Sequence, residues 1–392
     1  MDNRKYKYIC SSFTKNAKVK YLLLFFLFLF GTTSSIAQET DSTEIRKKVL
    51  ENAIANLTLG LNDFDDAPRL NKGIRLMFYN TENLFFPEDD STKRDEDFTP
   101  EGMKGWSYYR YQQKLNNIYK VLMAVGGWEP PAAIGFCELE HKKVLDDLIN
   151  KTPLRKFGYK VIYEESPDRR GIDVGFIYRP SKFKYIDHEA LRVNFPFDKT
   201  LRTRDVLHVR GQILGRDTLS VFVNHWPSRW GGQIKSEPKR VYVASIVRKK
   251  VDQLYGENPN LKAVVMGDFN DHSDNKSLVE TLRAKGEIDN LKEGDLYNYM
   301  HLLSKNWQLG SHKYQGHWGT LDHIIVSEKL LNERRENHLR ASKKGAHIFA
   351  ARFLLVEDTK FLGLKPFRTY SGPRFIGGFS DHLPIYLDLL YE

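Results

Sequence analysis

Cysteine is nearly absent from this chain of 392 residues, which contains only Cys10 and Cys137. Cys10 lies in an N-terminal stretch that we expect to be removed, so Cys137 would have no partner and a disulfide-stapled scaffold is excluded. A zinc site built from several thiolates is excluded for the same reason. Cys137 ends the apolar run "AIGFC", and we interpret it as a core residue rather than a nucleophile.

The chain also has little hydrophobic sequence of membrane-spanning length. The run "YLLLFFLFLF" at 21–30 has ten residues, whereas a transmembrane helix needs about 20. It follows several lysines and precedes "GTTSSIAQ", in which Ser35 and Ala37 have the spacing of a cleavage site. This pattern predicts a signal peptide over 1–37 and a secreted or periplasmic protein without a stable membrane anchor. The alternative is a membrane anchor; a lipoprotein anchor is not expected, because no Cys follows the apolar run.

A strong charge of one sign is lacking as well. The formal net charge is +10, but residues 1–37 hold six Lys or Arg and one Asp, and their removal leaves +5. A mildly basic protein is compatible with a nucleic-acid partner without arguing strongly for one. We find no internal repeats, and we expect a monomer.

Strand-like runs dominate the chain from residue 74 onward. They are rich in Val, Ile, Phe and Tyr and are bounded by Gly, Pro and Asp. Helical stretches are predicted near 107–125, 141–151, 237–255 and 276–285. Because strands and helices do not alternate strictly, we predict an α/β (α+β) fold in which sheets pack together with helices outside. Residues 38–72 predict an N-terminal extension with one amphipathic helix, and 73–392 one domain, which the family resemblance given below implies to be catalytic. The segments 286–320 and 335–378 are expected to be functional loops.

Polar side chains stand at the ends of seven predicted strands, where rigid scaffolds hold catalytic groups. These residues are Asn80, Glu82, Glu138, Asp173, Asn224, His225, Asp268, Asn270, Asp322, His323, Asp381 and His382. Taken singly, each is more simply a turn or structural residue. Together they form a set of oxygen donors with imidazoles, which suits Mg²⁺, Mn²⁺ or Ca²⁺ and phosphate-ester chemistry.

The stretch "VVMGDFNDHSDN" at 264–275 concentrates this pattern. Asp268 and Asn270 are two residues apart and are expected to project to the same side of an extended chain. We expect Gly267 to let the strand turn, and we interpret His272 and Asp274 as a solvated turn and a helix N-cap. The alternative is that the whole stretch is a solvated turn.

The ordered motifs resemble the endonuclease/exonuclease/phosphatase superfamily. They are "YNTENLF", "FCELE", "RRGIDVGFIYR", "VNHWPSR", "GDFND", "LDHIIVS" and "GGFSDHLPI", and they span about 74–390. The resemblance implies a four-layer α/β sandwich of two packed, mostly antiparallel sheets flanked by helices, with the site at one rim. It also implies a metal-dependent phosphoric ester hydrolase.

The resemblance assigns roles residue by residue. Asn80 and Glu138 match the metal-holding pair, and Asp381 a metal- or site-side neighbour. Asp268 matches the residue that activates water, and Asn270 a phosphate contact. His382 matches the phosphate-binding His, with Asp322 as its orienting carboxylate. His225 resembles the second His, with Asp173 as its candidate partner. Glu82 departs from members that have Asp there, so a metal role is not assigned to it.

Three functions remain open from the sequence. The first is a metal-dependent nuclease, for which Trp226 and Trp230 would stack bases while Arg229 meets phosphates; the alternative for both tryptophans is the core. The second is a phosphatase or phospholipase C-like phosphodiesterase on lipid headgroups or small phosphate esters, with "FAARFLLVEDTKFLGLKPF" as a membrane-touching loop or, alternatively, a strand pair. The third is an inactive binding module.

Overall fold

The structure, a computed structural model, describes residues 72–305, 309–331, 338–361 and 363–391. The chain divides into two units, Met1–Ile54 and Ala55–Glu392, and every described residue belongs to the second. The predicted signal peptide and the predicted amphipathic helix lie outside the described residues. The account below therefore concerns the predicted catalytic domain.

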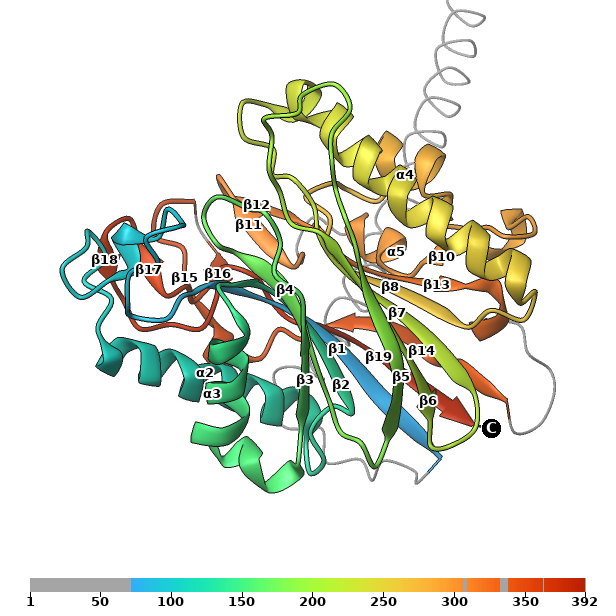
Figure 1. Cartoon of the computed structure of the whole chain (residues 1–392), viewed down its shortest axis with the longest axis horizontal. Coiled ribbons are helices and arrows are strands. Elements are labelled where there is room, and N and C mark those ends of the chain that lie inside the picture. The colour runs from blue at the N-terminus through green and yellow to red at the C-terminus, as the bar shows by residue number, and fades with distance from the viewer. Residues whose placement is uncertain (1–71, 306–308, 332–337, 362, 392) are drawn as a thin grey trace, which may run out of the picture. The chain divides into compact units, whose positions relative to one another are not determined.

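Two large sheets form the centre of the domain (Figure 1). The six-stranded sheet has the order β14 (Leu339–Ile348), β19 (Ile385–Tyr391), β1 (Gly73–Leu84), β2 (Ala133–Leu139), β4 (Asp173–Tyr178) and β3 (Lys160–Tyr163). The seven-stranded sheet has the order β5 (Phe183–Leu191), β6 (Val206–Ile213), β7 (Thr218–His225), β8 (Ala263–Asp268), β13 (Asp322–Ser327), β10 (Leu296–Asn298) and β9 (Ala284–Lys285). Most neighbouring strands are antiparallel.

Each sheet has a parallel pair near its middle, β1 with β2 and β7 with β8. Parallel neighbours need a long crossover, usually a helix. Here α2 (Tyr108–Gly126) lies between β1 and β2 in the chain, and α4 (Gln233–Glu257) lies between β7 and β8. The carboxyl ends of each pair therefore share an edge, and these four strand ends carry the candidate site.

Helices cover the outer faces of the two sheets, with α2 and α3 (Lys142–Lys151) on one side and α4 on the other (Figure 1). Neighbouring residues on β7 show the layering: Val223 belongs to the core between the sheets, and Phe222 to the separate cluster under α4. A strand buried on both faces is apolar throughout rather than alternating. The predicted fold class is confirmed.

Close packing between the sheets depends on a glycine. A Cβ at Gly135 of β2 would lie 2.8 Å from Cε of Met266 and 3.0 Å from the methyl carbons of Val223. Real Cβ atoms rarely approach neighbours this closely, so a larger residue would require Met266 and Val223 to shift. The first sheet is thereby held directly against the strands that carry His225 and Asp268.

Of the four helices predicted within the described residues, three are present. Residues 276–285 form only a short π-turn, Ser277–Thr281, which is preceded by Lys276, so the predicted N-cap at Asp274 was wrong. The long segments contain short elements: α5 (Met300–Ser304), β11 (His312–Tyr314), β12 (His317–Gly319), β15 (Leu355–Glu357), β16 (Leu364–Pro366), β17 (Tyr370–Ser371) and β18 (Arg374–Phe375). Single 3₁₀ turns span Glu96–Phe98, Pro153–Phe157, Ile288–Asn290, Glu328–Leu330 and Arg352–Leu354.

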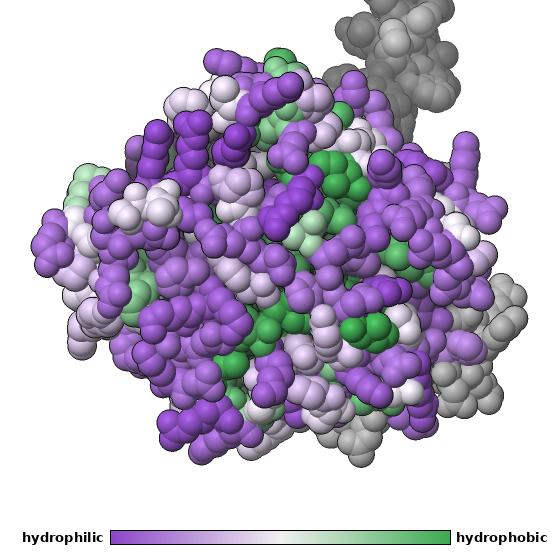
Figure 2. Space-filling model, viewed as in Figure 1, coloured by the Kyte–Doolittle hydropathy of each residue, from purple (hydrophilic) through white to green (hydrophobic). Residues whose placement is uncertain are grey.

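The surface is largely polar on the face shown in Figure 2, where hydrophobic side chains appear in separated groups. Within the described ranges, none of the helices combines the length and apolar character needed to cross a membrane.

Candidate active site

Four strand ends meet at one rim and bring together Asn80 and Glu138 of the first sheet with His225 and Asp268 of the second. Nδ2 of Asn80 donates to Oδ2 of Asp268 at 3.2 Å and, at 3.4 Å, to Oε1 of Glu138. Nε2 of His225 lies 3.8 Å from Oε1 of Glu138 and 3.9 Å from Oδ2 of Asp268. Residues that are 188 positions apart in the chain therefore face one another across the two sheets.

His382 stands between two carboxylates. Its Nδ1 lies 2.7 Å from Oδ2 of Asp322, and its Nε2 lies 3.8 Å from Oδ2 of Asp268. The structure thus shows the contact that was predicted between Asp322 and His382. Burial alone would lower the pKa of His382, but Asp322 and Asp268 raise it well above its usual range, so the imidazole is protonated at neutral pH.

Asp268 is itself an unusual carboxyl group. It is buried, and burial raises its pKa to about 7 against the opposing effect of His382, while Asp322 adds to the rise. Its Oδ1 accepts the backbone N–H of Asn270 at 2.9 Å, which leaves Oδ2 facing the other site residues. A base with a pKa near the working pH suits proton transfer.

Gly267, the residue before Asp268, serves close approach rather than a turn. A Cβ there would lie 2.3 Å from the carbonyl oxygen of Asn224 on β7. The strand β8 continues through Gly267 to Asp268, so the predicted turn at Gly267 was wrong. The close approach of β7 and β8 places His225 opposite Asp268 in register.

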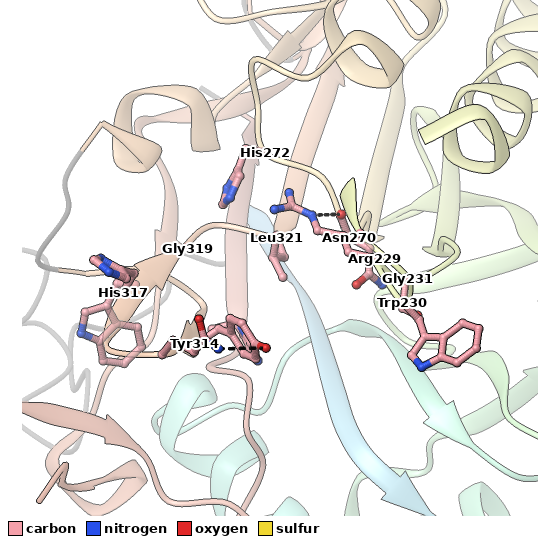
Figure 3. A pocket seen from close by; sticks show the side chains of 14 residues that line it. Arg229, Trp230, Gly231, Asn270, His272, Tyr314, His317, Gly319 and Leu321 are labelled. Atoms are coloured by element: carbon pink, nitrogen blue, oxygen red, sulfur yellow. Dashed lines mark hydrogen bonds between the residues drawn. The ribbon is translucent and has the colours of Figure 1, made fainter. Parts of the chain in front are cut away.

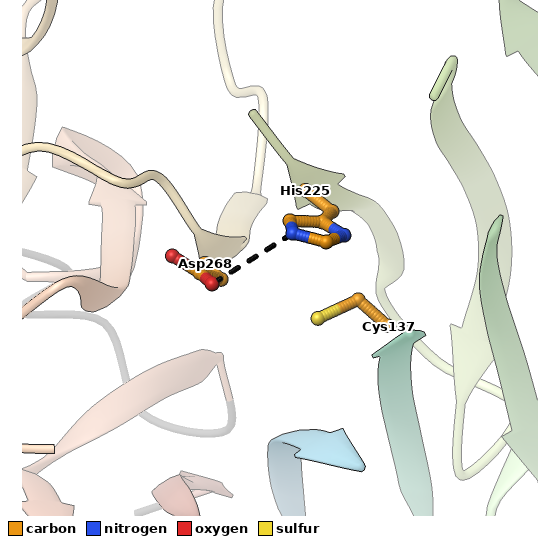
Figure 4. Close-up of side chains that lie close together, drawn as sticks. All are labelled: Cys137, His225 and Asp268. Atoms are coloured by element: carbon orange, nitrogen blue, oxygen red, sulfur yellow. Dashed lines mark ion pairs between the residues drawn. The ribbon is translucent and has the colours of Figure 1, made fainter. Parts of the chain in front are cut away.

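His225 is buried like His382 but has cations as its main electrostatic neighbours. Burial, followed by the charges of Arg204 and Arg170, holds its pKa well below the usual range, so it is neutral. Cys137 lies beside it, and one ligand atom each of Cys137, His225 and Asp268 lies within 4.8 Å of the others (Figure 4). Burial raises the pKa of the Cys137 thiol, so no thiolate is available as a ligand, and Cys137 acts as a core residue.

Trp226 corrects one prediction. Its ring is 0% exposed and packs edge-on against Phe269, so it offers no free face to a base. Its carbonyl oxygen instead accepts hydrogen bonds from Nδ2 of Asn270 at 3.0 Å and from Nη2 of Arg204 at 2.7 Å. Trp226 is therefore a support for Asn270, and the predicted stacking on this ring was wrong. Trp230, four positions later, is 88% exposed.

Asp173 corrects a second prediction. Its carboxyl group contacts the Tyr163 hydroxyl and accepts the backbone N–H of Ser166 at 2.9 Å. No hydrogen bond or ion pair between Asp173 and His225 occurs among the described residues, so the predicted pairing was wrong. Nδ1 of His225 is buried without a hydrogen-bond partner in the described part of the chain. The start of β4 gives Asp173 local partners that the sequence pattern did not reveal.

Several site residues have a left-handed backbone. The φ angles are 50° at Glu82, 56° at Asn83, 60° at Glu138 and 51° at Asn270. Non-glycine residues rarely adopt such angles, and the cost is about 1–3 kcal/mol for the less tolerant types. The conformations are held by specific bonds: Asn83 donates its N–H to Oε2 of Glu138 at 3.1 Å, and Glu82 donates to Oδ1 of Asn80 at 2.9 Å.

The donor chemistry at Glu138 fits a hard divalent cation. Among the described residues, its one basic neighbour within 4 Å is His225, which is neutral, and the charges of Lys114 and Arg368 act on the carboxylate from farther away. Carboxylate and amide oxygens suit Mg²⁺, Mn²⁺ or Ca²⁺. The Asp381 carboxylate differs from that of Glu138, because it forms an ion pair with Arg368 at 2.5 Å. The Glu82 carboxylate accepts the backbone N–H of Thr369 at 2.6 Å. Glu138, Asn80 and Asp381 therefore all stay predicted ligands, and Asp381 is the one that has a cationic partner in the structure.

A pocket of about 780 Å³ opens beside the site (Figure 3). Its lining includes Asn270 and Arg229, whose Nε donates to the carbonyl oxygen of Asn270 at 2.7 Å. His272 also lines the pocket, a position that the predicted solvated turn did not include. Arg229 lines the pocket, while its guanidinium also lies 3.4 Å from Asn275 and 3.8 Å from Asp271, and its predicted contact with substrate stays a prediction.

Two supporting residues escaped the sequence reasoning. Arg204 donates to the Trp226 carbonyl from a loop without periodicity. Arg240 of α4 lies fully buried with its Nε 2.7 Å from Oδ1 of Asp271, next to Asn270. The sequence offers only a weak indication that Arg240 pairs with the last Asp of "GDFND", because α4 carries many other charged residues.

Two packed sheets that present carboxylates, an amide and two imidazoles at one rim define a phosphoesterase-type α/β sandwich. The family model described as "Endonuclease/Exonuclease/phosphatase family" matches residues 75–390. The chain therefore belongs to the endonuclease/exonuclease/phosphatase family, and it is a phosphoric ester hydrolase. No match was found among curated proteins.

Solved structures similar to this chain include the catalytic domain of human Nocturnin with bound sulfate, at 17% identity, a TM-score of 0.49, and coverage of 82% of this chain and 96% of that one. An endonuclease/exonuclease/phosphatase protein from Bacteroides vulgatus is 15% identical, with a TM-score of 0.48 over 82% of this chain and 100% of that one. A family protein from Bacteroides thetaiotaomicron is 15% identical, with a TM-score of 0.47 over 82% and 95%.

Proposed function

We propose that the chain is a divalent-metal-dependent phosphodiester hydrolase that acts on nucleic acid. The observation that carries the proposal is the position of protonated His382, which lies 2.7 Å from Asp322 and 3.8 Å from Asp268. A cation beside a carboxyl group poised near neutral pH supplies both parts of phosphoester hydrolysis: a partner for the phosphate and a base for water.

Asp268 acts as the base in this proposal. Since Asn270 occupies Oδ1 through its backbone N–H, Oδ2 takes the proton from the attacking water. His382 contributes positive charge to a phosphate oxygen, and neutral His225 contributes a hydrogen bond. Asn270 is held by Trp226 and Arg229 and contacts the phosphate from the side of the pocket.

A divalent ion would be held by Glu138 with Asn80 beside it. Mg²⁺, Mn²⁺ or Ca²⁺ at these residues would supply positive charge that offsets the negative charge of the phosphate oxygens while water attacks phosphorus and the ester oxygen leaves. Asp322 orients His382 by accepting a hydrogen bond from Nδ1 of the imidazole. The other ring nitrogen, Nε2, then faces the reacting groups.

The alternative is a phosphatase or phospholipase C-like enzyme on lipid headgroups or small phosphate esters. Its proposed membrane-touching segment, 349–367, contains the strand pair β15 and β16, and Phe349, Leu354 and Leu355 are buried. Phe361 and Leu364 are 43% and 36% exposed, so the described part of the segment offers a membrane few exposed apolar side chains. An inactive binding module is the minor alternative, and it predicts no turnover.

For localisation, we propose a secreted or periplasmic monomer without a stable membrane anchor, on the basis of the pattern over 1–37. N-terminal sequencing of exported protein would find a start near residue 38. An intact Met1 in the membrane fraction would contradict export by cleavage.

The function is tested by assaying the purified mature protein against single-stranded and duplex DNA, RNA, sphingomyelin and a chromogenic phosphodiester. Each substrate is combined in turn with Mg²⁺, Mn²⁺ and Ca²⁺. We expect nucleic-acid cleavage that stops on chelation and that is lost in Glu138→Gln. Thermal melting adds a readout independent of activity: the metal raises the melting temperature of wild type and not of Glu138→Gln. Full activity after exhaustive chelation would overturn the metal proposal.

A further inference from the structure

The hairpin β11–β12 connects the pocket directly to the catalytic histidine. His312, the first residue of β11, forms a backbone bridge with His382, and the two rings have centroids 4.7 Å apart. The N–H of Leu383 donates to the carbonyl oxygen of Ser311 at 2.6 Å. A group bound against this hairpin therefore lies next to a phosphate held at His382.

Aromatic side chains stand on opposite walls of the pocket. Trp230 belongs to the loop after β7 and is 88% exposed, and Tyr314 ends β11 and is 66% exposed. Figure 3 shows them on either side of the opening, with His272 above them. Trp318 of β12 adds a third aromatic residue to the lining. Exposed rings in a pocket of this size offer stacking faces to a flat ligand.

The charges in the pocket lining limit the classes of ligand that it can bind. Arg229 is the one Lys or Arg in the lining formed by the described residues, and that lining has no Asp or Glu. Burial lowers the pKa of His272, and it lowers the pKa of His312 to about 4, so both rings are neutral at pH 7. A headgroup with several phosphates would need more cations than the single Arg229 of this lining.

We propose that this pocket binds an unpaired nucleobase next to the scissile phosphate, so that the preferred substrate is single-stranded nucleic acid. The inference rests on the proposed function and extends it to a substrate class. Trp230 and Tyr314 stack on the base, and the neutral imidazoles and Gln315 present hydrogen-bonding groups to its edge. A base inside a duplex is stacked and paired, and it reaches such a pocket only after unpairing.

The test compares an oligothymidylate, the same strand annealed to oligoadenylate, and an abasic oligomer of equal length and charge. Trp230→Ala and Tyr314→Ala are the variants, because both side chains are exposed and their loss leaves the core intact. Trp128→Ala is the matched control: Trp128 is 76% exposed and precedes β2, at the end of that strand opposite Glu138.

We expect each pocket variant to raise KM for oligothymidylate by about fivefold or more, with kcat little changed, because stacking is worth about 1–3 kcal/mol per base. The abasic oligomer should be insensitive to both variants, and the control variant should match wild type on every substrate. In the metal-free Asp268→Asn protein, adding Trp230→Ala should weaken binding of labelled oligothymidylate by a similar factor.

Equal affinity for the base-bearing and abasic oligomers, or binding unaffected by both substitutions, would overturn the pocket assignment while leaving a nuclease in place. Cleavage of a phosphocholine ester with no cleavage of any oligomer would instead overturn the proposed function together with the pocket assignment.

Discussion

Asn80 of β1 donates a hydrogen bond from Nδ2 to Oδ2 of Asp268 on β8, at 3.2 Å, and so joins the two sheets at the rim that holds the candidate site. The same amide nitrogen lies 3.4 Å from Glu138, so one side chain relates the proposed metal ligand to the proposed base. The relative position of these two carboxylates depends on both sheets at once.

Asp268→Asn separates chemistry from folding. We expect kcat to fall by about 10²–10⁴-fold, because general-base transfer contributes that much, with a smaller effect on substrate binding. The folded pKa of Asp268 is raised to about 7, so wild type loses stability as the pH rises from about 3.9 through 7, and the amide variant does not.

At pH 8 without metal, thermal melting should therefore show Asp268→Asn to be at least as stable as wild type, although the amide loses an acceptor for Asn80. Asp274→Asn, at an exposed Asp in the same loop, is the control and should leave both kcat and melting unchanged. Near-normal turnover in Asp268→Asn would show that the stretch 264–275 is a structural turn.

Asp322→Asn should shift the pH dependence of activity. Protonated His382 is required in the proposed function, so activity is lost as pH rises through the pKa of His382. Removing the Asp322 carboxylate lowers that pKa, so the alkaline limb of kcat against pH moves down by about 1–3 pH units. A profile identical to wild type would mean that Asp322 does not act through His382.

Asp173→Asn should retain activity and gain stability at alkaline pH. The single hydroxyl hydrogen of Tyr163 faces both Asp173 and the carbonyl oxygen of Glu140, which lies 2.9 Å away. One hydrogen cannot serve both acceptors, but a protonated Asp173 can donate its own hydrogen bond to the Tyr163 oxygen. Burial raises the pKa of Asp173 to about 7, which favours this protonated form. An amide can make the same bonds at every pH.

Wild type therefore loses stability from this group between about pH 4 and pH 7, at about 1.4 kcal/mol for each pKa unit, while the variant does not. Chemical unfolding at pH 5 and pH 8 measures the difference. A variant with full stability and no turnover would restore Asp173 to the catalytic residues.

Arg240→Ala should destabilise the domain through a buried charge. Asp271 would keep Gln233 at 2.8 Å and Ser277 at 2.6 Å but lose its nearer ionic partner, which leaves it only the pair with Nη2 of Arg229 at 3.8 Å among the described residues. Breaking a fully buried pair costs about 3–5 kcal/mol. Lys142→Ala breaks the exposed pair with Asp146 and should cost about 0–1 kcal/mol. Equal losses of unfolding free energy in the two variants would contradict this account.

The fold class was predictable because short apolar runs that end in polar residues indicate strands within a few neighbouring positions of the sequence. The same signature did not distinguish Asp322 from Asp173, since both begin strands and differ in what folding places beside them. Trp226 and Trp230 are four positions apart in one motif, yet one is fully buried and the other is 88% exposed. Arg204 could not be found from the sequence, because its contact with Trp226 spans 22 positions and follows no period.

The close contact between the two sheets at Gly135 makes the geometry of the candidate site sensitive to the distance between the sheets. Met266 and Val223 pack against the bare backbone of β2, three residues before Glu138, so the spacing of the sheets affects the distance between Glu138, the proposed metal ligand, and Asp268, the proposed base. Slight swelling of this layer would change that distance without breaking a hydrogen bond between strands. We therefore expect mild denaturant, heat or an overpacked core to lower activity before circular dichroism registers a loss of structure.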